Sequence, residues 1–177
     1  MTGSSEVVFP AVAVRTRTGR DLQVRAFVRE EFGAVVQMYK VFEPKRIAQG
    51  LPPPDVPRIA QWLDRLEQKS EALLAWEGNK AVAHAILCPI DAASVEFTIF
   101  VHQDYREDGL GTALARETLQ WAVRLGFSRA YLTTETSNYR ALRLFRKLGF
   151  RTTSRSGDEV EMHLELASLD SERPLAA

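Results

Sequence analysis

The sequence has little of what marks several common protein classes. Cys88 is the only cysteine, which excludes an internal disulfide and is typical of a reducing compartment. The 23 basic and 23 acidic residues balance, so net charge indicates neither nucleic acid nor an anionic membrane as a partner. No apolar run reaches the length of a membrane span, and the first residues lack the basic segment of a signal peptide. We therefore expect a cytoplasmic protein with no membrane partner.

Histidines are also few. His84, His102 and His163 are far apart in the chain and share no metal-ligand spacing, so no metal site is expected. His84 falls inside an apolar run, where a packed or surface role is commoner than a catalytic one. The length of 177 residues, with 45% hydrophobic and 26% charged residues, suits one globular domain.

Hydrophobic periodicity predicts alternating strands and helices along nearly the whole chain. Alternating or β-branched runs predict strands at 11–17, 21–28, 72–76, 81–88, 95–101, 130–134, 150–153 and 160–166. Helical spacing predicts helices at 30–39, 58–68, from Gly109 to Leu125, and 138–148. This order predicts an α/β fold with a mixed central sheet flanked by about four helices.

The stretch from Val95 to Thr112 organises the prediction, because it joins an apolar strand to a glycine-bearing turn and a long amphipathic helix. The first turn of a helix exposes unpaired N–H groups and carries the positive end of the helix dipole. Gly109 and Gly111 would let an anion approach those amides closely. The pair is equally compatible with a tight strand-to-helix turn that binds nothing.

Two familiar phosphate loops fit this stretch poorly. A P-loop requires Gly-Lys-Ser/Thr, whereas Gly111 is followed by Thr112 and Ala113. A dinucleotide fingerprint requires a third small residue where Leu114 stands, although Glu135 follows the next strand where a ribose-binding acid is expected. A nucleotide-dependent dehydrogenase is thus a distant alternative.

The pattern Arg106-x-x-Gly109-x-Gly111 resembles the acetyl-CoA signature, Q/R-x-x-G-x-G/A, of the GNAT superfamily of N-acetyltransferases. The lead-in from Val101 to Arg106 is similar to that family's V-x-P-x-Y-R, with Gln103 where proline is frequent. Further along, the stretch from Asn138 to Phe150 resembles the second signature, N-x-x-A-x-x-x-Y-x-x-x-G-F. Two motifs in the right order are far more specific than one.

The resemblance covers residues 21–166, which we expect to form a single GNAT-like domain. Residues 1–20 are then a leader with the first strand, and 167–177 a polar tail. It implies acetyl-CoA as acyl donor and transfer of the acetyl group to an amine. By analogy with the family, the donor-binding residues are Ile99, Phe100, Val101, Arg106, Glu107, Asp108, Gly109, Leu110, Gly111, Thr112, Asn138 and Phe145. For Asn138, a helix N-cap role is a strong alternative.

Glu96 is the candidate catalytic base. A carboxylate within a strand of valine, phenylalanine and isoleucine is costly unless it faces a wet cleft or a partner. The run VEFTIFV is also similar to the corresponding strand of phosphinothricin-type acetyltransferases, whose glutamate there is the presumed base. The alternative is a solvent-exposed glutamate without catalytic function.

Position 145 departs from the family pattern. Many members carry a tyrosine there that is thought to protonate the CoA thiolate, and Phe145 has no hydroxyl. Water or another donor must replace it, and Tyr139 is a weak substitute because it lies on a different side of the predicted helix. This departure slightly favours a second hypothesis, a non-catalytic acyl-CoA-binding regulatory module.

The acceptor cannot be identified from the sequence. The resemblance implies that residues 42–55 wall the acceptor side of the site, although a proline-rich connector would look the same. We expect a small-molecule amine as substrate, with a protein amine or a longer acyl donor left open. An edge strand near the C-terminus makes a homodimer possible.

Overall fold

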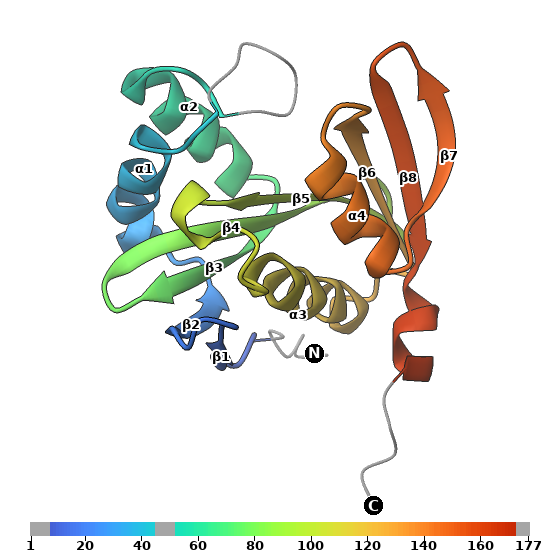
Figure 1. The fold of residues 1–177 in the computed structure, drawn as a ribbon, viewed down its shortest axis with the longest axis horizontal. Helices are drawn as coiled ribbons and strands as arrows, with labels where there is room; N and C mark the ends of the chain where they lie inside the picture. The colour runs from blue at the N-terminus through green and yellow to red at the C-terminus, as the bar shows by residue number, and fades with distance from the viewer. Residues whose placement is uncertain (1–7, 45–51, 173–177) are drawn as a thin grey trace, which may run out of the picture.

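The computed structural model describes residues 8–44 and 52–172, which form one eight-stranded sheet in the order β1-β2-β3-β4-β5-β6-β8-β7 with helices on both faces (Figure 1). The strands are β1 (Val12–Arg15), β2 (Asp21–Ala26), β3 (Glu71–Glu77), β4 (Lys80–Pro89), β5 (Ser94–Val101), β6 (Arg129–Glu135), β7 (Arg151–Ser156) and β8 (Glu159–Glu165). The α-helices are α1 (Phe32–Lys40), α2 (Val56–Glu67), α3 (Leu110–Arg124) and α4 (Tyr139–Lys147). Three 3₁₀ turns, η1 (Arg29–Glu31), η2 (Gln103–Tyr105) and η3 (Leu166–Glu172), complete it. The predicted fold class is confirmed.

Local turns account for the hairpins. β1 and β2 pair around a turn in which Gly19 has φ +88°, and β3 and β4 pair around Gly78, with φ +56°. Both are conformations that glycine adopts without steric cost. These two antiparallel hairpins lie where the sequence predicts them, because short-range turn chemistry decides them.

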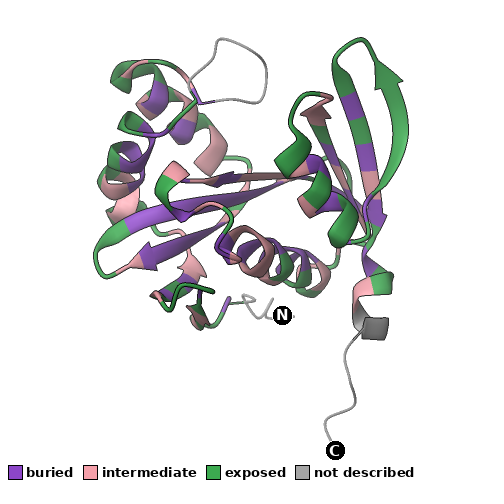
Figure 2. Cartoon of the chain, viewed as in Figure 1, coloured by how far each residue is buried: buried purple, intermediate pink, exposed green. Residues whose placement is uncertain are grey.

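The sheet has an apolar core on each face (Figure 2). On one face α3 and α4 pack against β5 through residues such as Val95 and Phe97. On the opposite face α1 and α2 pack against the sheet through residues that include Ile86 and Phe100. Successive strand residues point to opposite faces, so β5 contributes to both cores. This double burial explains its nearly continuous apolar sequence.

The sheet is forked at its centre. All neighbouring strands are antiparallel except β5 and β6, and these two are paired only between residues 94–96 and 129–131. β6 continues instead alongside β8 over residues 129–135 (Figure 1). Among the described strands, the last five residues of β5, 97–101, therefore have β4 on one side and none on the other.

The C-terminal hairpin forms the far edge of the sheet. Of the strands in residues 8–44 and 52–172, β7 pairs with β8 alone, and every residue of β7 is exposed. Within the described part of the chain, no helix is long and apolar enough to cross a membrane.

Candidate active site

An amide-lined cradle lies at the start of α3. Gly109 is the N-cap, with φ +88°, and Glu107, two residues earlier, has φ +59°. The N–H groups of Leu110, Gly111 and Thr112 precede the first α-helical hydrogen bond, which runs from the Ala113 amide to the Gly109 carbonyl. Unpaired amides at the positive end of a 15-residue helix attract an anion.

The β1–β2 turn braces this cradle from outside. The Asp108 carboxylate accepts hydrogen bonds from the Thr18 amide (2.8 Å) and the Thr18 hydroxyl (2.6 Å), and the Arg17 amide donates to the Asp108 carbonyl (3.0 Å). The hydroxyls of Thr18 and Thr16 hold the pKa of Asp108 below its usual range. The side chain of Asp108 thus anchors the loop to the turn, a role that the sequence does not signal because 90 residues separate the partners.

Three guanidinium groups surround the cradle. Arg106 donates to the Val101 carbonyl (2.8 Å) and to the carbonyl of Glu43, and its pKa is lowered by burial and by the charge of Arg140. Arg140, on α4, forms an ion pair with Glu107 (3.2 Å). Arg17 donates to the Glu107 carbonyl and runs beside Gly109, where an added Cβ would lie 3.8 Å from its Cγ. Sequence reasoning predicts only Arg106; Arg17 and Arg140 reach the cradle through tertiary structure.

The fork exposes backbone next to the cradle. The His102 amide donates to the Val82 carbonyl of β4, and hydrogen bonding alternates along an antiparallel pair. Phe100 consequently directs its backbone groups toward β4, whereas Phe97, Ile99 and Val101 direct theirs toward the fork. Because Arg106 occupies the Val101 carbonyl, the Val101 N–H is the group that this residue presents there. The register thus separates Phe100 from the other two predicted backbone contacts.

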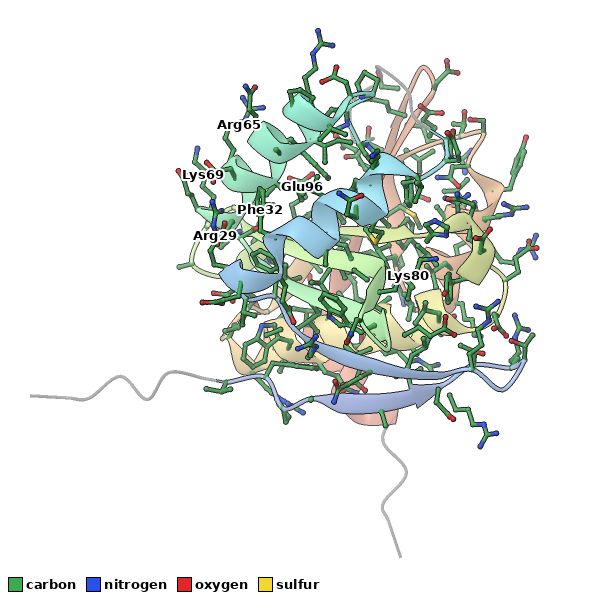
Figure 3. All side chains as sticks on the ribbon, turned by 90° about the vertical axis from the view of Figure 1, so that its left-hand side faces the viewer. Arg29, Phe32, Arg65, Lys69, Lys80 and Glu96 are labelled. Carbon is green, nitrogen blue, oxygen red and sulfur yellow. The ribbon has the colours of Figure 1, made fainter. Side chains whose placement is uncertain are left out.

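Glu96 lies where the strands part. It is exposed and lies on the α1–α2 face of β5 (Figure 3). Its cross-strand partners are Cys88 on β4 and Tyr131 on β6. Burial and the negative charge of Glu96 raise the pKa of the Cys88 thiol. A carboxylate at the mouth of the fork, on the face opposite α3, can take a proton from a group that approaches from the α1–α2 side.

The model of the family described as "Acetyltransferase (GNAT) family" matches residues 35–150, which include the cradle, the fork and Glu96. The chain belongs to the GNAT acetyltransferase family.

Curated relatives match over shorter stretches. N-acetyltransferase 8 of Homo sapiens is 37% identical over 60 residues, covering 34% of this chain and 26% of that protein. N-acetyltransferase family 8 member 3 of Rattus norvegicus is 40% identical over 53 residues, or 30% and 23% of the two chains. The chain spans about a quarter of the length of these relatives.

Solved structures resemble the whole fold. The GNAT domain of S. lividans PAT has a TM-score of 0.77 at 17% identity, covering 88% of this chain and 96% of that one. The putative acetyltransferase yncA of Salmonella typhimurium, solved with acetyl-CoA as its cofactor, has a TM-score of 0.66 at 20% identity, covering 82% and 94%. At these identities the likeness concerns the fold.

The second GNAT motif forms α4, which packs against β5 on the same face of the sheet as α3. The Asn138 side chain accepts a hydrogen bond from the Ala141 amide (3.2 Å) and so caps α4, the alternative role that its sequence context suggests. Phe145 is buried against Phe97 of β5, with ring centroids 6.3 Å apart. Tyr139 is 73% exposed and lines a pocket between α4 and the β7–β8 hairpin to which β5 contributes nothing.

The α1–α2 face carries an aromatic cluster. Tyr39, Phe42, Trp62 and Phe100 contact one another with ring centroids 5.1–5.8 Å apart. Asp55, at the end of the predicted acceptor wall, accepts a hydrogen bond from the Arg58 amide (3.0 Å) and caps α2. Residues 45–51, within the predicted acceptor wall, lie outside the described residues.

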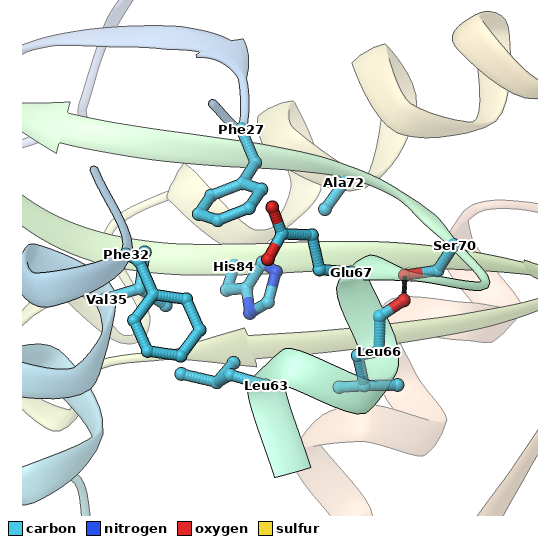
Figure 4. A pocket seen from close by; sticks show the side chains of 9 residues that line it. All are labelled: Phe27, Phe32, Val35, Leu63, Leu66, Glu67, Ser70, Ala72 and His84. Atoms are coloured by element: carbon cyan, nitrogen blue, oxygen red, sulfur yellow. Dashed lines mark hydrogen bonds between the residues drawn. The ribbon is translucent and has the colours of Figure 1, made fainter. Parts of the chain in front are cut away.

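His84 is part of this packing. Its Nδ1 pairs with the Tyr39 hydroxyl at 2.8 Å, and burial lowers its pKa to about 3. Beside it lies a cavity of about 20 Å³ whose polar lining includes Glu67 and Ser70 (Figure 4). That volume holds about one water molecule, so this cavity is too small to be an acceptor pocket. Glu67, in the lining of this cavity, forms an ion pair with Arg29, which also pairs with Asp64 of α2.

Proposed function

We propose that this protein is an acetyl-CoA-dependent N-acetyltransferase that moves the acetyl group to the amine of a small molecule by direct attack. The observation that carries the proposal is the fork: β5 loses its partner immediately after Glu96, beside an anion-binding helix terminus. The free strand edge and the amide cradle together suit a donor with an amide-rich arm and a pyrophosphate. Membership of the GNAT family supports the same reading.

The donor side of the site is built mainly from backbone. The first-turn amides of α3 bind the pyrophosphate of acetyl-CoA, and Gly109 and Gly111 keep the approach open. Arg17 and Arg140 add positive charge on either side of the loop. The edge of β5 from Val101 to Phe97 pairs with the pantetheine arm, and a free amide at the Glu96 end of that edge polarises the thioester carbonyl. Phe145 packs beneath the fork as an apolar floor.

The acceptor approaches from the opposite face of the sheet. Glu96 accepts a proton from the attacking amine, because it is the carboxylate of the last β5–β6 pair, at the opening of the fork on that face. The neighbouring thiol of Cys88 has a raised pKa and stays protonated near neutrality, which disfavours it as a nucleophile that would compete for the acetyl group. This supports direct transfer without an acyl-enzyme.

The test is release of free CoA thiol from acetyl-CoA across pooled amino acids, polyamines and aminoglycosides, with wild type and Glu96→Gln. Amine-dependent release that collapses in the variant, while acetyl-CoA still binds, would support both the activity and the base. Binding with no release from any pool would instead favour the non-catalytic acyl-CoA-binding module, the reading to which the hydroxyl-free Phe145 lends weight.

A further inference from the structure

Tyr131 stands at the point where the two central strands part. It is the cross-strand partner of Glu96 in the last pair that joins β6 to β5. Residues in register on neighbouring strands of a sheet present their side chains on the same face, at about 5 Å spacing. Glu96 and Tyr131 therefore flank the opening of the fork on the acceptor face, one on each strand.

The ring of Tyr131 packs against a neighbouring ring, and its hydroxyl forms no hydrogen bond with the described residues. Tyr131 is half-buried and lies against His163, its partner on β8, with ring centroids 6.2 Å apart and ring planes 31° from parallel. Among the described residues, no hydrogen bond joins the Tyr131 hydroxyl to another group, in contrast to Tyr39 and Tyr105, which pair with His84 and Glu77. The Tyr131 hydroxyl is also not among the described buried polar atoms that lack a partner, so it is accessible and free to contact a ligand beside the candidate base.

Neither of the two α4 side chains considered from the sequence, Phe145 and Tyr139, can donate a proton at the fork. Phe145 lies beneath the fork and carries no hydroxyl. Tyr139 is exposed and lines the pocket formed with Arg155 and Val160. Within the described residues, β6 is the strand on the other side of the opening, and Tyr131 is its residue at the branching point.

We propose that Tyr131 is the proton donor to the departing CoA thiolate, which rests on the proposed acetyl transfer. The amine nitrogen forms the C–N bond and its proton passes to the Glu96 carboxylate. The C–S bond breaks, its electron pair goes to sulfur, and the Tyr131 hydroxyl donates its proton to that sulfur. The proton held by Glu96 then returns to the Tyr131 oxygen, so that the products are an amide and free CoA and both side chains regain their starting states.

The ordinary pKa values of a phenol and a thiol suit an acid that acts mainly by donating a hydrogen bond. An ordinary tyrosine has a pKa of about 10 and an alkyl thiol about 8.5, so full transfer from phenol to thiolate is slightly uphill. The hydroxyl stabilises developing charge on sulfur by a charge-assisted hydrogen bond, and the return of the proton from Glu96 completes the exchange.

The kinetic test compares Tyr131→Phe with the double variant Tyr131→Phe/Phe145→Tyr and with Tyr139→Phe as the matched control. We expect Tyr131→Phe to lower kcat about 10- to 100-fold with little change in KM for acetyl-CoA. The double variant should recover much of that loss, because its new hydroxyl reaches the fork from the α4 side. Tyr139→Phe should behave as wild type. An unchanged kcat in Tyr131→Phe, or a rise in the acceptor KM alone, would overturn the assignment.

An equilibrium test needs no turnover. Calorimetry would measure binding of CoA and of desulfo-CoA, which lacks the thiol, to wild type and to Tyr131→Phe. If Tyr131 contacts the sulfur, wild type prefers CoA about fivefold or more and the variant loses that preference. Equal preference in both proteins would refute the contact. A wild type that binds CoA but acetylates no amine would count against the proposed function, and this comparison would still decide the contact.

Discussion

The two faces of β5 differ in the groups that they present: backbone N–H groups on one face and side chains on the other. Toward α3 the site consists of backbone amides at a helix terminus and along an unpaired strand edge. Toward α1 and α2 the proposed site consists of side chains, Glu96 and Tyr131. In the proposed function, backbone N–H groups recognise what every reaction of this type shares, the phosphates and amide arm of acetyl-CoA. Side chains are free to vary and so can select the acceptor.

The difference also appears in how each face is braced. On the donor side, hydrogen bonds from Thr18 to Asp108 and from Arg106 to the Val101 carbonyl hold the loop in one shape. On the acceptor side, apolar packing dominates, with the Tyr39–His84 hydrogen bond buried within it. Substitutions that affect one face and spare the other would establish the division.

The largest expected effect is on the acceptor face. Glu96→Gln should lower kcat by about 100-fold or more, because general-base catalysis contributes on that order, while the Kd for acetyl-CoA stays unchanged. Glu161→Gln, which removes an exposed carboxylate from β8, is the matched control and should leave kcat near wild type. Steady-state kinetics with isothermal titration would measure both; a parallel loss of acetyl-CoA binding would break the proposed division of the faces.

The next effect belongs to the donor face. Gly109→Ala should weaken acetyl-CoA binding about tenfold, since a methyl group at φ +88° strains the N-cap and narrows the approach to the amides. Gly126→Ala imposes similar strain, at φ +95°, beyond the opposite end of the same helix. Both variants should melt at lower temperature, and only Gly109→Ala should change the Kd. Equal Kd values would mean that the cradle does not bind the donor.

A smaller effect is expected from the brace. Thr18→Val removes the hydroxyl that donates to Asp108 and should raise KM for acetyl-CoA about fivefold, corresponding to about 1 kcal/mol for one hydrogen bond. Thr18→Ser retains the hydroxyl and should restore most of the affinity. The kcat at saturating donor should be nearly constant in both, whereas a change in kcat alone would contradict a role in loop positioning.

The smallest effect concerns stability. His84 is buried neutral with a pKa of about 3, below the ordinary value near 6.5, so its unfolded form binds a proton that its folded form does not. The stabilising contribution of neutral His84 to the free energy of unfolding is therefore complete above pH 6.5 and is lost as the pH falls toward 3. Chemical unfolding between pH 6.5 and 5, above the range of ordinary carboxylates, should show a steeper fall for wild type than for His84→Gln. Identical slopes would mean that His84 is protonated in the folded protein.

The sequence predicts the elements well where the signal is local. The two N-terminal hairpins follow from Gly19 and Gly78, and the start of α3 follows from Gly109 and the change in apolar spacing. The two GNAT motifs are also local, and they lead to the family and to the proposed donor-side residues. The exclusion of Phe100 from the backbone contacts requires the strand register, which periodicity cannot supply.

What the sequence determined by itself is therefore the α/β fold, the family and the loop that carries the cradle, because each depends on residues within one turn or one period of each other. The tertiary structure decided the rest. The pairing of Glu96 with Tyr131, the brace between Thr18 and Asp108, and the approach of Arg17 and Arg140 to Glu107 join residues far apart in the chain. Such contacts depend on where β5 and β6 separate and how the sheet is ordered, and no short-range pattern encodes that.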